Sequence, residues 1–197
     1  MSFRKILPVL SVCMIFIQVT LQGQVTMEKG DGGILFKEDG KQIFFYQSEQ
    51  KNINGEFERT NYIHPLWGID GAVLTEDFPA DHLHHRGIYW AWHQVWIDGK
   101  RIGDPWELKN FEQNVSEIEF FMKSNGTGVL KTEVKWMSDQ WIKLGRKVPY
   151  LHENAKITIH PENRNYRRID FEIILLALEK NLEIGGSEDE KGYSGFS

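Results

Sequence analysis

Apolar and polar residues alternate with a period of two along most of the chain after residue 30, which is the pattern of half-buried β-strands. Two such runs, residues 33–37 and 41–46, flank Glu38-Asp39-Gly40, a sequence typical of a hairpin turn. Further strands are expected at 62–67, 72–75, 87–97, 111–123, 128–137 and 155–160. Many short strands with frequent turns and no long amphipathic helix predict a mostly β fold, an antiparallel β-sandwich.

Two segments of this pattern need a separate interpretation. The range 169–178 is apolar enough for a core strand, but its length also permits a helix, and periodicity does not decide between them. In the range 87–97, three tryptophans are separated by even numbers of positions and so share one face of a strand. This predicts one buried sheet face rather than a sugar platform. The aromatic residues better placed to stack on a ligand are Trp67, Trp106 and Tyr193.

The first 24 residues differ from the rest. Arg4 and Lys5 precede an almost wholly apolar run, residues 6–21, and a small polar segment follows. This is the outline of a secretory signal peptide. The alternative is a membrane anchor, but a run of about 16 residues is short of the roughly 20 that a helical span needs. We therefore expect residues 1–24 to be a signal peptide and residues 25–197 to be a β-sandwich domain, exported to the periplasm or the cell exterior without stable membrane insertion.

Composition narrows the chemistry of this domain. The one cysteine, Cys13, lies inside the predicted signal peptide, so the mature domain is expected to use neither a disulfide nor a thiolate. The net charge is −5 and acidic and basic residues are interspersed, which argues against a nucleic acid partner. Aromatic residues make up 13% of the chain, consistent with a large core or a sugar-stacking surface. A small-molecule or oligosaccharide ligand is the expected partner, and no organic cofactor is implied.

The segment Asp81-His82-Leu83-His84-His85-Arg86 concentrates the candidate chemistry. In an extended chain His82 and His84 would point to one face and His85 to the other. Two imidazoles so spaced can share a divalent metal, with a third ligand drawn from elsewhere, but there is no His-Glu-x-x-His motif and no residue is assigned as a metal ligand. Alternatively, the imidazoles exchange protons with a sugar that Arg86 orients. A third interpretation is that they are buried polar residues satisfied by the backbone.

Two other features hold charged residues that could contact a ligand. Residues 186–193 place carboxylates and Lys191 between flexible glycines, as in a functional loop or a solvated acidic turn. Arg59 precedes Tyr62-Ile63-His64-Pro65 and is either a surface residue or a ligand clamp.

The chain also resembles a known family. The motifs that carry the resemblance are Arg59-Thr60-Asn61-Tyr62-Ile63-His64-Pro65-Leu66, Asp70-Gly71, Leu74-Thr75, Asp77-Phe78-Pro79, Asp81-His82-Leu83-His84-His85-Arg86-Gly87 and Gly185-Gly186-Ser187-Glu188-Asp189-Glu190-Lys191-Gly192-Tyr193. They are similar to a bacterial exported family catalogued as "methane oxygenase PmoA" or as a domain of unknown function. Its members are typically longer, so the resemblance implies that this chain is an incomplete portion of a longer domain. Methane oxidation in a bilayer is not expected, because the only apolar segment is the predicted signal peptide.

More distantly, the family resembles galactose-mutarotase-like supersandwich proteins, which act on sugars. That resemblance implies a concave, His-rich site with His84 or His85 as general acid or ligand clamp, Arg86 as an orienting group, and Glu188 or Asp189 as a carboxylate partner.

These observations together predict an exported PmoA-like protein that binds or acts on carbohydrate, as an isomerase, lyase or hydrolase if it is an enzyme. The alternatives are a non-catalytic sugar-binding module and a metal-dependent oxygenase. The predicted catalytic residues are His84, His85, Glu188 and Asp189, and the predicted substrate-binding residues are Arg59, His64, His82, Arg86, Lys191 and Tyr193.

Overall fold

A computed structural model describes residues 23–197, so the predicted signal peptide lies almost wholly outside the described residues. The described part of the chain contains strands and no helix. The strands are β1 (Val25–Gly30), β2 (Gly33–Glu38), β3 (Lys41–Gln47), β4 (Lys51–Ile53), β5 (Glu56–Arg59), β6 (Tyr62–Leu66), β7 (Trp90–Trp92), β8 (Gln94–Ile97), β9 (Lys100–Gly103), β10 (Glu112–Met122), β11 (Gly128–Met137), β12 (Ile142–Lys143), β13 (Arg146–Lys147), β14 (Leu151–Ile159), β15 (Ile169–Ala177), β16 (Leu182–Gly185) and β17 (Ser194–Phe196).

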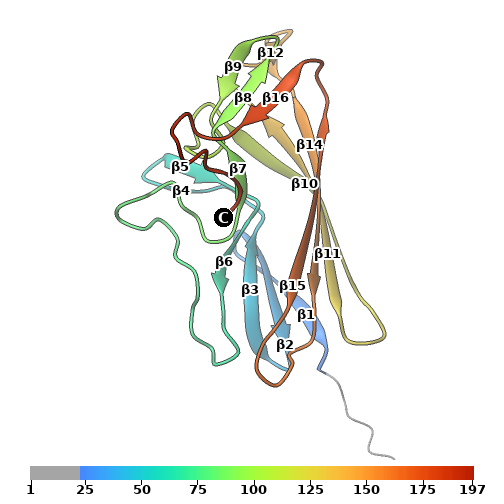
Figure 1. Ribbon diagram of the computed structural model, residues 1–197. Helices are drawn as coiled ribbons and strands as arrows, with labels where there is room; N and C mark the ends of the chain where they lie inside the picture. The colour runs from blue at the N-terminus through green and yellow to red at the C-terminus, as the bar shows by residue number, and fades with distance from the viewer. Residues whose placement is uncertain (1–22) are drawn as a thin grey trace, which may run out of the picture.

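Two four-stranded antiparallel sheets form the body of the molecule (Figure 1). Their strand orders are β1-β2-β3-β6 and β10-β11-β14-β15. Alternate residues of both sheets meet in one buried cluster, which includes Phe36, Phe44, Leu130 and Ile157. Burying apolar side chains between two sheets is the main stabilisation available to a helix-free domain. The structure thus confirms a mostly β, antiparallel, sandwich-like fold.

The hairpin between β2 and β3 follows directly from its sequence. Asp39 and Gly40 have φ angles of 50° and 81°, so both central residues of the turn are left-handed. That geometry twists in the same sense as the flanking strands, and Asp-Gly adopts it at low cost. Beyond the turn, β2 and β3 pair along their whole length, with one register irregularity near Phe36.

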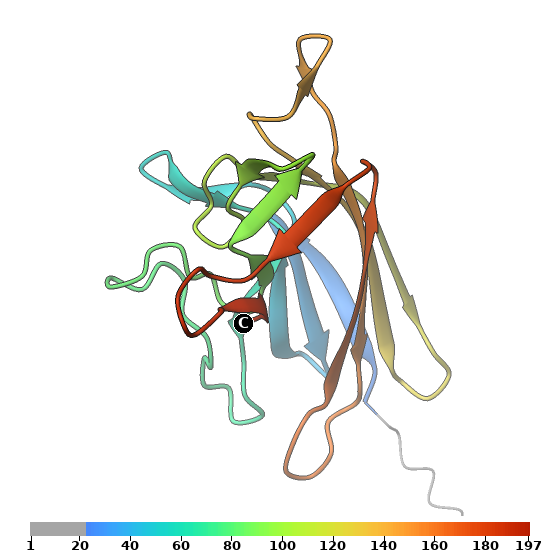
Figure 2. The ribbon, with the colours of Figure 1, turned by 45° about the horizontal axis from the view of Figure 1, so that its top comes forward.

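Smaller sheets close one end of the sandwich. Strands β16, β8 and β9 form a three-stranded sheet, and β17 pairs with β7 (Figure 2). They pack on the β10-β11-β14-β15 sheet through a second buried cluster, which includes Trp90, Val95, Trp136 and Tyr150. This end of the molecule carries most of the candidate site.

Several strands differ from the sequence-based expectation. The range 87–97 is two strands, β7 and β8, because β7 pairs with β17 whereas β8 pairs with β9 and β16. The range 72–75 contributes only an isolated bridge, between Trp67 and Val73, so a strand there was wrong. The range 169–178 is the strand β15 and not a helix. Of the three regularly spaced tryptophans, Trp90 is buried in the core, whereas the other two are only partly buried.

A buried polar network joins the two large sheets. Glu153 on β14 is fully buried, and its carboxylate accepts hydrogen bonds from Asn61 Nδ2 and Trp136 Nε1, both at 2.8 Å. Asn61 in turn accepts a hydrogen bond from the Tyr46 hydroxyl at 2.8 Å. Burial raises the pKa of Glu153, although these bonds oppose the shift. The network fixes the segment just before β6, which includes Arg59.

Candidate functional site

The histidine-bearing segment is anchored by Arg86, whose side chain is fully buried. Its Nε donates to Asp77 Oδ1 at 2.5 Å and its Nη2 to the Tyr62 hydroxyl at 2.6 Å. Its Nη1 donates to the carbonyls of Phe57 and Lys51 at 2.6 and 3.1 Å. The guanidinium thus ties the 77–86 segment to the β4–β5 hairpin and to β6. The structure places Arg86 in the protein interior and not on a ligand surface, in contrast to its predicted role.

Gly87, directly after Arg86, allows the chain to pack closely against β6. It has a φ of 73°, and a Cβ added there would lie 2.2 Å from the carbonyl oxygen of Ile63. Ile63 and Ile88 form a reciprocal pair of backbone hydrogen bonds of 2.9 Å at this point. Only glycine permits both the left-handed backbone and the close approach to β6. Arg86-Gly87 is therefore a structural anchor that presents the histidines before it.

The three histidines lie in a turn and not in an extended strand. The His82 amide donates to the Pro79 carbonyl and the His85 amide to the His82 carbonyl, each at 2.9 Å. The segment is therefore not extended, and the separation of the rings onto two faces that an extended chain would give does not apply. The ring of His82 lies 5.0 Å from that of His85 and 5.8 Å from that of His84, and His84 and His85 lie 4.5 Å apart. We call His82, His84 and His85 the histidine turn.

Two carboxylates lie against this turn: Asp81 Oδ2, on the exposed side, is 3.1 Å from His82 Nδ1, and Glu107 approaches His84. The Oε1 of Glu107 lies 3.6 Å from His84 Nε2. Burial lowers the pKa of His84 and of His85; the neighbouring imidazoles and Arg59 act in the same direction, and Glu107 opposes them. Both imidazoles are consequently neutral near pH 7 and can accept a proton. Glu107 could not be recognised from the sequence, because it lies in a separate turn where nothing in the local sequence indicates contact with the histidines.

Trp106 forms the centre of a stack of three rings. Its ring lies 5.3 Å from His93 and 6.0 Å from Tyr193, with interplanar angles of 23° and 14°. The ring of His85 contacts the Trp106 ring edge-on, with 6.2 Å between the two ring centres. Because both faces of its indole are covered and only 9% of it is exposed, Trp106 is not free to stack on a sugar. Tyr193, 49% exposed, remains a candidate.

A chain of ion pairs links the acidic loop to this cluster. Arg101 binds Glu188 Oε1 through Nη1 at 3.0 Å and Asp104 Oδ2 through Nη2 at 3.1 Å. Asp104 Oδ2 lies 3.4 Å from His93 Nδ1, which leads back to Trp106. The acidic loop and the histidine turn thus both contact Trp106, the first through Tyr193 and the second through His85.

Within the acidic loop the predicted residues have different surroundings. Glu188 is exposed and paired with Arg101, as described. Asp189 Oδ1 accepts hydrogen bonds from the Ser187 hydroxyl at 2.6 Å and from the Lys191 amide at 3.1 Å, bonds that lower its pKa. Asp189 therefore stabilises its own turn. The Lys191 ammonium lies 5.4 Å from the centre of the Tyr193 ring.

Arg59 lies beneath the stack. It is 2% exposed, its Nη2 donates to the Pro105 carbonyl at 2.7 Å, and its guanidinium lies 4.4 Å from the Tyr89 ring. Its Nε is buried and has no partner among residues 23–197. Burial lowers the pKa of Arg59 to about 10, so it is still a cation. Arg59 is thus close to the predicted site but buried, and it is not on the surface that a ligand would contact.

His64 is not part of this cluster. Its Nδ1 lies 3.0 Å from the Thr75 hydroxyl, and it lines a separate cleft together with Gln47 and Lys51. Burial lowers its pKa. Of the predicted substrate-binding residues, His64 lies at a separate cleft, and Arg59 and Arg86 are buried.

Five clefts in the described part of the chain are lined by residues other than those of the histidine turn. In the same part, no three His, Cys, Asp or Glu side chains are arranged to hold a metal ion. Nor does any helix there have the length and apolar character to cross a membrane.

The geometry defines an all-β sandwich with an aromatic and imidazole-rich surface at one end. Residues 34–197 match a family described as "Family of unknown function (DUF6807)", and the chain belongs to that family. No curated protein and no solved structure matches the chain. The resemblance to PmoA-like and galactose-mutarotase-like proteins stays a prediction, because nothing in these comparisons connects the chain with either.

Proposed function

We propose that this protein is exported and binds or acts on carbohydrate at the surface formed by the histidine turn, Glu107 and Tyr193. The observation that carries the proposal is the convergence of these groups around Trp106, although they come from three distant parts of the sequence. Sugars are bound by aromatic faces together with hydrogen-bonding groups that contact hydroxyls, and this surface offers both.

His84 and Glu107 are the proposed acid/base pair. A neutral imidazole can take a proton from a sugar hydroxyl or from water, and a carboxylate 3.6 Å away stabilises the imidazolium that results. His85 and His82 lie against His84 and can bind further hydroxyls. Tyr193 offers the exposed part of its ring, and the Lys191 ammonium lies over that ring. Glu188 and Asp189 have a supporting role in this arrangement, since their carboxylates hold Arg101 and the acidic loop.

The second candidate, a non-catalytic sugar-binding module, is favoured by the exposure of Tyr193, 49% of which is open to solvent. An enzyme that excludes water usually encloses its substrate, whereas a binding module can use an open aromatic surface.

The decisive experiment is a panel of oligosaccharides tested for binding and for turnover with the mature chain, with His84→Ala, Tyr193→Ala and the control His160→Ala. His160 is a partly exposed histidine directly after β14, bonded to Asp170 and Arg168, neither of which belongs to the proposed site. For an enzyme, turnover falls at least 100-fold in His84→Ala, with a pH–rate limb below the ordinary histidine pKa of about 6.5. For a binding module, affinity falls in Tyr193→Ala without any turnover.

Absence of both binding and turnover across the panel would overturn the proposal. So would a ligand whose affinity is the same in His84→Ala, Tyr193→Ala and the wild type. The metal-dependent oxygenase alternative predicts about one metal equivalent in the purified protein, which elemental analysis measures directly.

A further inference from the structure

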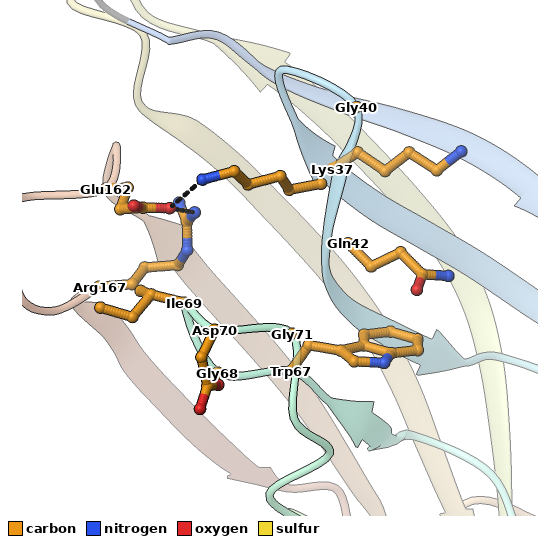
Figure 3. A pocket seen from close by; sticks show the side chains of 11 residues that line it. Lys37, Gly40, Gln42, Trp67, Gly68, Ile69, Asp70, Gly71, Glu162 and Arg167 are labelled. Atoms are coloured by element: carbon orange, nitrogen blue, oxygen red, sulfur yellow. Dashed lines mark hydrogen bonds and ion pairs between the residues drawn. The ribbon is translucent and has the colours of Figure 1, made fainter.

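A second cleft lies away from the histidine turn, between the β2–β3 turn, the connection after β6 and the loop that follows β14. Its volume is about 450 Å³. It is lined by Lys37, Gly40, Lys41, Gln42, Trp67, Gly68, Ile69, Asp70, Gly71, Glu162 and Arg167, none of which belongs to the proposed site described above. Figure 3 shows Trp67 and Gln42 on one side of this cleft and Glu162 and Arg167 on the other. We call it the Trp67 cleft.

One wall of the cleft is fixed by a buried ion pair. Arg167, with 9% of its side chain exposed, binds Glu38 Oε2 at 2.5 Å and the His160 carbonyl at 3.1 Å. Glu38 also accepts hydrogen bonds from the Glu162 amide, at 3.0 and 3.2 Å. This wall therefore exists before any ligand arrives, and binding there has little ordering cost.

The opposite wall holds the aromatic ring of Trp67. The Trp67 amide donates to the Ile43 carbonyl at 2.8 Å, and a tight turn after it is closed by the Gly68 amide and the Ala72 carbonyl at 2.8 Å. Yet Trp67 belongs to none of the buried clusters and to none of the aromatic pairs found within residues 23–197. It differs in this from Trp106, whose two faces are covered. An indole that is fixed by its backbone and partly exposed in a cleft is suited to stack on a ligand.

The charges of the cleft indicate which ligand. Arg167 is neutralised by Glu38 and Glu162, the Lys41 ammonium lies 3.7 Å from Glu162 Oε2, and the Lys37 ammonium is paired with Glu28 at 2.6 Å. The cations are thus balanced within the wall, which gives an anionic ligand no net attraction. What remains for a ligand is the Gln42 amide, the carboxylates at the rim and the indole face.

We propose that the Trp67 cleft binds one neutral pyranose unit of a saccharide. The apolar face of the sugar ring stacks on Trp67, and its hydroxyls bond to the Gln42 amide and to the carboxylates of Asp70 and Glu162. This site does not depend on the proposed function of the histidine turn, since the two share no lining residue.

The test is titration of the mature chain with neutral hexasaccharides of glucose, xylose and mannose, followed by calorimetry and by ligand-observed NMR. One of them is expected to bind, with saturation transfer concentrated on the protons of one sugar face. Trp67→Ala is expected to weaken that binding at least tenfold, and Trp67→Phe, which keeps a ring, by less. Tyr193→Ala is the matched control, because it removes an exposed aromatic ring from the other site. Circular dichroism confirms that each variant is folded.

Three outcomes would overturn this site. Binding lost in Tyr193→Ala and kept in Trp67→Ala would place the sugar at the histidine turn alone. No binding by any of the three neutral hexasaccharides would remove the assignment, whatever the histidine turn does. Binding that is confined to acidic oligosaccharides such as oligogalacturonate, and is insensitive to Trp67, would show that the indole is not the platform.

Discussion

The anchoring role of Arg86 leads to the sharpest prediction from this structure. Replacing it with Met keeps much of the aliphatic volume and removes the charge and every donor. Asp77, with 6% of its side chain exposed, then keeps only Lys51 as a charged partner, and two backbone carbonyls lose their hydrogen bonds. Removing one member of a buried ion pair typically costs about 3–5 kcal/mol. We expect a loss of unfolding free energy of that size.

The measurement is thermal unfolding of the mature domain followed by circular dichroism. For a domain of this size, 1 kcal/mol shifts Tm by roughly 2–4 °C, so Arg86→Met should lower Tm by about 6–20 °C. The control is Arg146→Met, which removes an exposed arginine on β13 and should change Tm by no more than roughly 2 °C.

A double-mutant cycle separates the two causes of the loss. If the unpaired carboxylate of Asp77 dominates, Arg86→Met combined with Asp77→Asn is less destabilised than Arg86→Met alone. A Tm for Arg86→Met within 3 °C of the Arg146→Met control would refute the reasoning, because it would mean that the buried guanidinium contributes no more than a surface charge.

Three further predictions concern the same region and its support. Gly87→Ala places a Cβ against a β6 carbonyl and also strains the left-handed backbone, whereas Gly40→Ala strains the backbone alone. Chemical denaturation should show a loss of unfolding free energy of about 1–2 kcal/mol for Gly40→Ala and clearly more for Gly87→Ala. Equal losses would contradict the close approach of Gly87 to β6. In NMR titrations the pKa of His84 should lie below about 6.5, and Glu107→Gln should lower it further; a higher pKa in Glu107→Gln would refute the assigned contact. Because the pKa of His84 is depressed in the folded state, this residue contributes stability that is present above about pH 6.5 and is lost as the pH falls through the folded-state pKa. Glu153→Gln replaces one of the two accepting carboxylate oxygens with an NH2 group, which then faces a donor instead of accepting from it. The unfolding free energy should fall by about 1–3 kcal/mol at pH 7 in a denaturant titration, whereas an unchanged midpoint would mean that the network adds nothing.

Much of the sandwich could be predicted because its strands are amphipathic. The range 128–137 alternates over its whole length and is β11, and the Asp39-Gly40 turn between β2 and β3 was recognisable from its residue types. The split of residues 87–97 into β7 and β8 could not be predicted, since it depends on which distant strands pair with each half. Local alternation reports burial of one face and carries no information on partners.

The candidate site shows the same limit at the level of single residues. The histidines were conspicuous in the sequence, but their mutual contact depends on a turn that period-two reasoning treated as extended. Arg86 was taken for a ligand group, since nothing in its own segment shows that Asp77, Tyr62 and two carbonyls surround it. Glu107 was not singled out, because contact with His84 arises only from the folded arrangement of two turns.

The Arg86 anchor also bears on how fast a ligand could be captured. The histidine turn is joined to β6 and to the β4–β5 hairpin by hydrogen bonds from a single buried side chain and by the Ile63–Ile88 pair. A loop restrained in this way offers its imidazoles in one arrangement at all times. Encounter with a ligand would then be governed by diffusion and orientation, without a slow conformational step beforehand.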